Sequence, residues 1–431
     1  MEYVPLLVLI LSFICLLAIG TPVAWSIAIS ATLTMLVSIP ALPALTTVAQ
    51  RMAAGLDSFA LLAIPFFVLS GELMNRGGIA RRLIAFAKTL VGAMPGGLAL
   101  INVISAMLMG AIAGSALASA SAMGSMLGPE MEKQGYSREF GAAVNITSAT
   151  TGLVIPPSNI LIVYSLASGG ASIAALFLAG YIPGILTGLF LMTVAYFWAR
   201  KKGYRGGERS RLPEVVRTFV DAVPSLLLLV VVIGGIVAGI FTATEASAIA
   251  VLYSLVLGVA YREINLRNLP GIALEASATT AIVMLLIGAS MGMSWVLSYE
   301  HIPQEISEGL LGLTDNKVVI LLIINLILLA VGIFMDMTPA VLIFTPIFLP
   351  VVTRLGIDPV HFGIIMILNL CIGLCTPPVG SVLFVGVGIA KTSIEKVVRP
   401  LVPLFVAMIV ALFLVTYIPE LSLWLPSLFD L

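Results

Sequence analysis

Charged side chains are scarce in this chain of 431 residues: only 10% are Asp, Glu, Lys or Arg, whereas 60% are hydrophobic. Soluble domains carry about 25% charged residues, so this composition excludes a water-soluble globule, a disordered chain and a disulfide-stapled secreted domain. A helix needs about 20 apolar residues to cross a bilayer, which leaves room for about ten spans. Because 21 basic residues balance 21 acidic ones, no net charge favours nucleic-acid binding. The sequence predicts an all-helical, multi-pass protein embedded in a lipid bilayer.

Residues that bind transition metals or perform nucleophilic chemistry are also few. The three cysteines, Cys15, Cys371 and Cys375, lie within apolar stretches, and the only histidines are His301 and His361. Two histidines exclude a three-histidine metal site, and the sequence contains no Walker A pattern for nucleotide binding. We therefore expect neither an enzyme nor a nucleotide-driven pump, and no organic cofactor.

Charges and helix-breaking residues divide the chain into candidate spans. We expect crossings at residues 5–19, 23–39, 61–73, two within 140–199, and at 219–240, 242–260, 280–297, 361–390 and 401–418. Two stretches, 46–59 and 79–90, mix charges with apolar residues and are expected to form interfacial arms. The N-terminus lacks the basic region of a cleaved signal peptide, so its first segment is expected to remain as a span.

Basic residues gather in one connection, residues 201–217, which holds six Lys or Arg against two Glu. The positive-inside rule predicts that this linker is cytoplasmic. Counting crossings outward from it places both termini on the opposite side. In a Gram-negative cell the protein would then lie in the inner membrane with both termini in the periplasm.

Similar residues recur at a constant offset along the chain. Gly-Leu-x-x-Pro-Pro occurs at residues 152–157 and again at 373–378, and the same offset joins Thr21 to Thr242. We interpret this as two repeats, residues 1–200 and 218–431, joined by the basic linker 201–217. Because the first would end in the cytoplasm and the second outside, their topologies are expected to be inverted. Inverted repeats are typical of secondary transporters, which bind ions and substrate where the repeats meet.

Each repeat contains a long apolar segment interrupted by small or polar residues, at 96–131 and 318–352. We expect each segment to form a re-entrant helical hairpin. Unpaired backbone groups at such a tip are tolerated at membrane depth only where they line a cavity or bind a ligand. Asp336 is a carboxylate in an apolar stretch, which is costly unless it is paired, hydrated or bound to an ion. The offset pairs Asp336 with Ser115 in the first hairpin.

The span after each hairpin, within residues 140–170 and 361–390, is interrupted by two consecutive prolines. Prolines remove backbone donors and break the helix, which frees carbonyl groups that can bind Na⁺ with neighbouring hydroxyls. A proline kink repaired by neighbouring helices is the structural alternative. Two equivalent breaks, each beside a hairpin and rich in oxygen, favour a hard cation.

Five stretches resemble the large membrane subunit of the tripartite ATP-independent periplasmic (TRAP) transporters, of the DctM and SiaM type. They are Ala63–Phe67 with Ser70–Glu72, Gly114–Ala116, Ile155–Ser158, Phe241–Ala246, and Gly332–Thr338 with Thr376–Gly380. They extend over nearly the whole chain in the order typical of the family.

The resemblance implies an elevator-type carrier in which the Na⁺ gradient drives uptake of an organic acid, such as a sialic acid-type sugar acid or a C4-dicarboxylate. A periplasmic substrate-binding protein would deliver the acid, and a small four-helix membrane subunit would brace the scaffold. One implied Na⁺ site comprises Ser115, Ser148, Thr151 and Gly152, and the other Asp336, Thr338, Asn369, Thr376 and Gly380. The substrate is expected between the tips, near Gly114, Ala116, Pro157, Ser158, Asn159 and Pro378, where helix N-termini can receive its carboxylate.

Other functions remain as alternatives. A stand-alone Na⁺/carboxylate symporter of similar architecture would need no binding protein. A channel is disfavoured because mirrored broken helices suit alternating access better than a permanent pore. An intramembrane protease is more remote, because Asp336 has no evident second aspartate and nothing in the spacing brings His361 near a serine.

Overall fold

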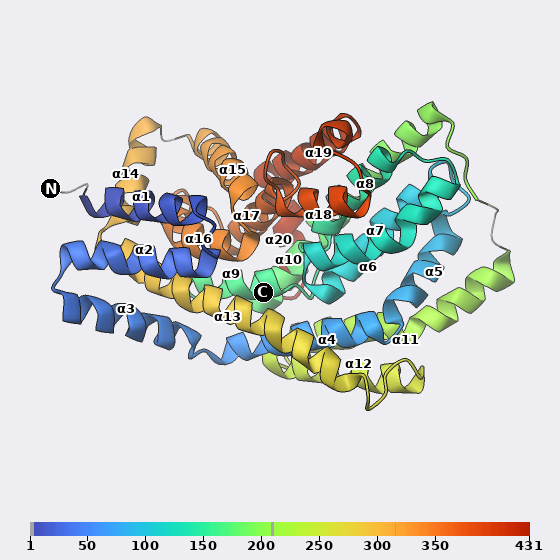
Figure 1. Ribbon diagram of the computed structural model, residues 1–431, viewed down its shortest axis with the longest axis horizontal. Coiled ribbons are helices and arrows are strands. Elements are labelled where there is room, and N and C mark those ends of the chain that lie inside the picture. The colour runs from blue at the N-terminus through green and yellow to red at the C-terminus, as the bar shows by residue number, and fades with distance from the viewer. Residues whose placement is uncertain (1–3, 208–210, 315) are drawn as a thin grey trace.

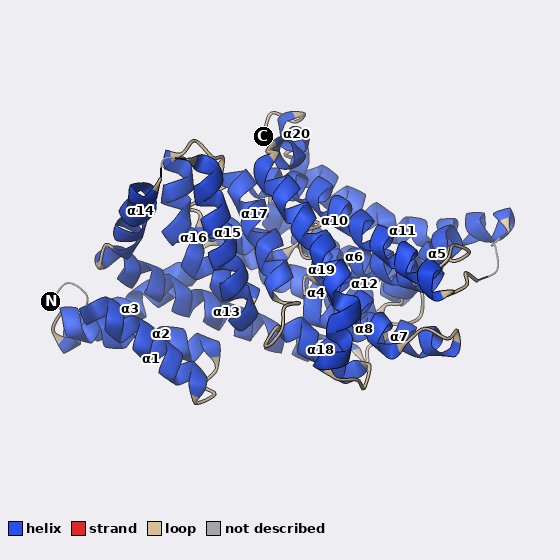
Figure 2. Ribbon diagram, turned by 90° about the horizontal axis from the view of Figure 1, so that it is seen from above, coloured by secondary structure: helices blue, strands red, loops and turns tan. Residues whose placement is uncertain are grey.

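The computed structural model describes residues 4–207, 211–314 and 316–431, and every regular element in these ranges is a helix (Figure 2). Among the described residues, eight helices are long and apolar enough to cross a membrane. Shorter apolar helices accompany them, including Val23–Ser38 and Pro359–Gly373. The all-helical architecture predicted from composition is confirmed.

The helices are short where glycine, serine or proline interrupts the apolar runs. In the first half they are α1 (Val4–Ala18), α2 (Val23–Ser38), α3 (Ala41–Leu56), the 3₁₀ turn η1 (Phe59–Leu62), α4 (Ala63–Arg76), α5 (Ile79–Val91), α6 (Gly97–Ala113), α7 (Ala116–Lys133), α8 (Arg138–Thr151), α9 (Asn159–Ala167) and α10 (Ile173–Lys202). The second half contains α11 (Leu212–Val237), α12 (Ala243–Ala260), α13 (Leu269–Tyr299), α14 (Ile302–Leu313), α15 (Lys317–Phe334), α16 (Met337–Arg354), α17 (Pro359–Gly373), α18 (Ser381–Ile389), α19 (Ile394–Tyr417) and α20 (Glu420–Ser427).

Helix bounds in the two halves correspond closely. The offset that joins Thr21 to Thr242 also carries both ends of α7 onto the ends of α16, and the first residue of α8 onto that of α17. The packing has the same correspondence: α7 contacts α18, and α16 contacts α9. Each half therefore contributes a helix to the surroundings of the other half's hairpin.

Two helical hairpins lie at residues 97–133 and 317–354. The first hairpin, α6 and α7, turns at Gly114 and Ser115, and the second, α15 and α16, turns at Met335 and Asp336. In each hairpin the two helices pack against one another, so the chain reverses within this short turn. The broken spans follow: residues 152–158, the first break, separate α8 from α9, and residues 374–380, the second break, separate α17 from α18.

One long helix differs from the expected span at residues 280–297. It is α13, which begins at Leu269 and packs against α2, α3 and α4 (Figure 1). The charge on Glu275 does not end the helix, because its carboxylate forms an ion pair with Arg76 at the end of α4. Arg81 likewise pairs with Glu263, and the Arg82 guanidinium lies 3.4 Å above the centre of the Tyr261 ring. These contacts join α4 to α13, and α5 to the connection between α12 and α13.

Candidate functional site

The tips of both hairpins line one cavity of about 270 Å³. The first tip contributes Gly114–Leu117, the second contributes Asp336–Thr338, and Asn159 lies at the start of α9 beside the first break. The facing wall comes from α4 and α13 and is mostly apolar: Val68, Thr279, Ile282, Val283 and Leu286. The cavity thus lies between the hairpin tips and two helices of the surrounding scaffold.

The first tip depends on a glycine and a serine. Gly114 has a φ of 60°, a left-handed conformation that glycine adopts without steric cost. A Cβ atom at Gly114 would lie 2.7 Å from Asn159 Nδ2, so the position also has no space for a side chain. Ser115 caps α7, since its Oγ accepts a hydrogen bond from Ala118 N at 3.3 Å. The turn therefore presents the first residues of α7 to the cavity.

The second tip presents a carboxylate. Asp336 occupies the N-cap position of α16, but its side chain makes no capping hydrogen bond. It is exposed to the cavity that it lines with Met337 and Thr338. A carboxylate at the N-terminus of a helix, without a cation among the described residues to neutralise it, can bind a cation from solution.

A buried polar contact joins each hairpin to the broken span beside it. Ser148 Oγ in α8 donates to Asn102 Oδ1 in α6 at 3.1 Å, and Asn369 Nδ2 in α17 donates to Asn325 Oδ1 in α15 at 2.7 Å. Ser148 and Asn369 are related by the same offset as the two proline pairs, whereas their partners Asn102 and Asn325 lie two residues out of that register. Sequence analysis missed Asn102 and Asn325, although an amide in an apolar hairpin arm is the signal that could have revealed them.

Glycines bring the same elements into backbone contact. A Cβ atom built on Gly152 lies 2.3 Å from Gly110 Cα, and one built on Gly373 lies 2.5 Å from Gly332 Cα. Only glycine permits so close an approach. The C-terminal end of α6 therefore lies against the first break, and that of α15 against the second.

Three further residues that were expected to bind Na⁺ or substrate through their hydroxyl groups lie at the breaks and do not line the cavity. The Thr151 hydroxyl donates to Ser148 O at 2.6 Å, that of Thr376 to Ile372 O at 2.7 Å, and that of Ser158 to Leu153 O at 2.5 Å. Each hydroxyl donates its proton to a carbonyl and keeps its oxygen lone pairs.

The structure brings together Gly114, Ser115, Ala116, Asn159, Asp336 and Thr338 around the cavity. The other expected site residues do not line this cavity: Ser148, Thr151, Gly152, Pro157, Ser158, Asn369, Thr376, Pro378 and Gly380.

One buried acceptor in α17, shortly before the second break, is open. Asn369 is fully buried, and its Oδ1 has no hydrogen-bond partner among the described residues. No group of three or more His, Cys, Asp or Glu side chains in the described ranges could hold a transition metal. The oxygen atoms near the tips are carbonyls, hydroxyls, amides and one carboxylate, which suit a hard cation.

Comparison with known proteins decides the family. Residues 10–421 match the model of the tripartite ATP-independent periplasmic transporter, DctM component. The chain belongs to this family. It is therefore a large permease subunit of a TRAP transporter and not an enzyme, and the resemblance noted in the sequence is confirmed.

Individual relatives agree with this assignment. The chain is 57% identical over 99% of its length to a Salmonella typhimurium protein named uncharacterized protein YgiK, 99% of which is covered. It is 39% identical to the C4-dicarboxylate TRAP transporter large permease DctM of Rhodobacter capsulatus, over 96% of this chain and 97% of that one. It is 40% identical to the sialic acid TRAP transporter large permease SiaM of Vibrio cholerae, over 88% and 89%.

The fold also resembles that of a more distant solved structure. The YdaH transporter of Alcanivorax borkumensis superposes with a TM-score of 0.65 at 14% identity, covering 90% of this chain and 89% of that one. At this identity the likeness concerns the fold alone. The architecture of this chain is therefore not restricted to its own family.

Proposed function

We propose that this DctM-family permease couples inward Na⁺ movement to uptake of an organic acid by an elevator mechanism. The observation that carries the proposal is the single cavity lined by both hairpin tips, with the Asp336 carboxylate open to it. Binding sites between repeats, at the ends of discontinuous helices, are characteristic of secondary transporters.

Two Na⁺ sites would lie where each hairpin meets its break. The first would use Ser115, Ser148, Thr151 and Gly152, and the second Asp336, Thr338, Asn369, Thr376 and Gly380. The Gly110–Gly152 and Gly332–Gly373 contacts support this, because they bring the end of a hairpin helix against a proline-broken segment. The open Oδ1 of Asn369 supports the second site, because a cation would satisfy it.

The substrate would be an anion held between the tips. The first turns of α7, α16 and α9 begin beside the cavity, and helix N-termini attract carboxylates. Gly114, Ala116 and Asn159, which line the cavity, are proposed to contact the substrate. Pro157, Ser158 and Pro378, in the breaks outside that lining, are the other proposed substrate-side residues. C4-dicarboxylate and sialic acid, named for two relatives, both carry a carboxylate, so an acid of one of these types is proposed here.

The moving unit would comprise both hairpins and both broken spans, and α13 with α2, α3 and α4 would belong to the stator. Two inverted repeats, 1–200 and 218–431, would give the moving unit equivalent outward and inward states. The matching bounds of α7 and α16 support the repeats. The basic linker 201–217 would be cytoplasmic and both termini periplasmic, in a bacterial inner membrane.

The family description names a tripartite system. Accordingly, we propose a periplasmic substrate-binding protein and a small four-helix membrane subunit as partners. A stand-alone symporter would transport without the first of these.

Uptake into proteoliposomes tests the proposal. The permease with both partners should accumulate a radiolabelled acid only when Na⁺ is higher outside, and removal of the binding protein should abolish accumulation. Uptake that ignores the Na⁺ gradient would contradict the coupling, and Na⁺-driven uptake without the binding protein would favour the stand-alone symporter.

Substitution of Asp336 tests the second Na⁺ site. Asp336→Ala and the isosteric Asp336→Asn should both abolish Na⁺-coupled uptake while leaving the protein inserted, since each removes the charge. Asp221→Asn is the matched control, because Asp221 is an exposed carboxylate on α11 that does not line the cavity. Normal Na⁺ dependence in Asp336→Asn would remove Asp336 from the site.

A further inference from the structure

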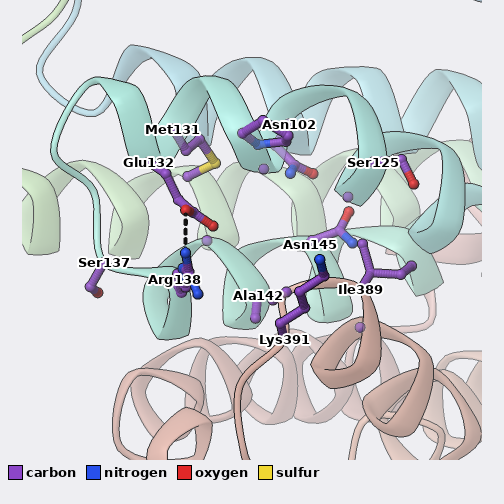
Figure 3. Close-up of a pocket in the computed structure, with 16 residues that line it drawn as sticks. Asn102, Ser125, Met131, Glu132, Ser137, Arg138, Ala142, Asn145, Ile389 and Lys391 are labelled. Atoms are coloured by element: carbon purple, nitrogen blue, oxygen red, sulfur yellow. Dashed lines mark ion pairs between the residues drawn. The ribbon is translucent and has the colours of Figure 1, made fainter.

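A second cavity lies at the opposite end of the first hairpin from the tips. Its volume is about 300 Å³, and α6, α7, α8 and the end of α18 surround it (Figure 3). None of its residues lines the cavity between the tips. Its polar side chains are Asn102, Asn145, Glu132, Arg138 and Lys391, with Ser125 and Ser137 at the rim. Sites for small molecules are concave, about 300 Å³ or larger, and carry a few converging polar groups.

The inner end of this cavity has an unsatisfied acceptor. Asn145 is 2% exposed, and its Nδ2 donates to Ala120 O at 2.7 Å. Its Oδ1 has no hydrogen-bond partner among the described residues, and Figure 3 shows the Asn145 amide within the cavity, facing Asn102. A buried acceptor left open costs about 1–3 kcal/mol. A ligand with a hydroxyl or ammonium donor would satisfy it.

Asn102 complements Asn145. Its Oδ1 already accepts from Ser148 Oγ, so its NH₂ group is the part available to a ligand. The inner end therefore offers one donor and one acceptor, close together on α6 and α8.

Among the charged side chains that line this cavity, Lys391 is left to bind an anion. Arg138 pairs with Glu132 at 3.0 Å, so these two neutralise each other. Lys391 makes no ion pair within the described part of the chain, and in Figure 3 its side chain extends toward Asn145. Lys391 also has a φ of 51°, which is uncommon for a residue with a side chain.

We propose that this cavity binds a small organic carboxylate that also carries a hydroxyl or ammonium group. The carboxylate accepts hydrogen bonds from the Lys391 ammonium and the Asn102 amide. The second group of the ligand donates to Asn145 Oδ1. None of the residues of this site lines the cavity between the tips, although Asn102 accepts a hydrogen bond from Ser148 of the proposed first Na⁺ site, and the ligand class follows from the site's own donors, acceptor and charge.

The position of this cavity indicates how a bound acid would act on the transport unit, and this step rests on the proposed function. Tyr204, in the basic linker, stacks on Tyr136 with ring centres 4.4 Å apart, so the base of the first hairpin lies beside the linker. The cavity then opens toward the cytoplasm, where imported acid accumulates. A bound acid joins α7 and α8 to α18, so it holds together elements that belong to the same proposed moving unit.

Protection of Lys391 from acylation tests the site directly. The full chain in lipid nanodiscs is treated with an amine-acetylating reagent, with L-malate or succinate or without acid, and acetylation is followed by mass spectrometry. L-malate should slow acetylation of Lys391 severalfold and leave Lys396, an exposed lysine on α19, unchanged. Succinate has the same carboxylates but no hydroxyl, so it should protect less.

Two variants test whether the acid binds within this cavity. Gly128 lines the cavity and a Cβ atom there meets nothing within 4 Å, so the backbone accepts a side chain at this position, and Gly128→Leu should occupy the cavity and abolish protection. Asn145→Leu removes the acceptor and should make malate no better than succinate. Equal acetylation of Lys391 with and without malate, or full protection in Gly128→Leu, would overturn the proposal.

Failure of the transport proposal can be distinguished from failure of the proposed second site. Asp336→Asn should lose uptake and keep protection of Lys391, because Asp336 does not line this cavity. Loss of protection in Asp336→Asn would place the malate between the hairpin tips and overturn the second site. Protection without Na⁺-driven uptake would overturn the transport proposal alone.

Discussion

Gly152→Ala is predicted to weaken Na⁺ binding at the first site by displacing the first hairpin from its break. The new Cβ atom would lie 2.3 Å from Gly110 Cα and 2.9 Å from Ala106 O, both of them backbone atoms of α6. Ordinary van der Waals contact begins at 3.4 Å, so α6 must move by about 1 Å. Backbone atoms cannot rotate away as a flexible side chain would.

The free-energy cost of this displacement can be estimated from substitutions that overpack a protein interior. Inserting a methyl group into a packed interior typically costs about 1–3 kcal/mol. If the strain falls on the ion-bound arrangement, the Na⁺ half-saturation concentration should rise by about 5- to 150-fold. Gly373→Ala should have a similar effect at the second site, where the Cβ atom would lie 2.5 Å from Gly332 Cα.

Na⁺-titrated uptake in proteoliposomes measures this effect, with both partner subunits present. Gly388→Ala is the matched control, because Gly388 is also helical and a Cβ atom there meets nothing within 4 Å. Thermal unfolding with and without Na⁺ separates weak ion binding from general destabilisation, since only the former reduces the stabilisation by Na⁺. A Gly152→Ala variant with the Na⁺ half-saturation of Gly388→Ala would refute the reasoning.

Substitutions at three further positions test the packing of the fold. Asn325→Leu removes one of the two acceptors of the Asn369 amide, the other being Asn325 O, and it also removes the donor to Thr416 Oγ1. It should lower the free energy of unfolding by about 1–3 kcal/mol, seen as a lower unfolding midpoint; an unchanged midpoint would show that these side-chain contacts contribute nothing. Thr242→Ala removes the capping box of α12 and should cost about 1 kcal/mol, whereas Thr242→Ser should retain most of it in the same assay. Tyr204→Ala should expose the basic linker to limited proteolysis, whereas Tyr204→Phe, which keeps the ring stacked on Tyr136, should resist it; equal cleavage of both would contradict the role of stacking.

Local chemistry explains which elements could be predicted from the sequence. Gly114 with Ser115 ends one helix and caps the next, and the paired prolines at 156–157 and 377–378 remove backbone donors wherever they lie in the fold. The chain turns at Gly114 and Ser115 and at Met335 and Asp336, and it is interrupted at residues 152–158 and 374–380. The start of α13 was missed because the charge of Glu275 is neutralised by Arg76, a partner distant in the sequence.

The sequence by itself determined that this chain is an all-helical membrane protein with interrupted helices, since composition and breaking residues act through their neighbours along the chain. Only the tertiary structure decided that Ser115 and Asp336, which belong to different halves of the chain, line one cavity with Asn159. It also decided that Ser148 and Asn369 bond to amides in the hairpins instead of lining that cavity. These contacts depend on the close approach of helices at facing glycines, and no local pattern specifies which glycines will face one another.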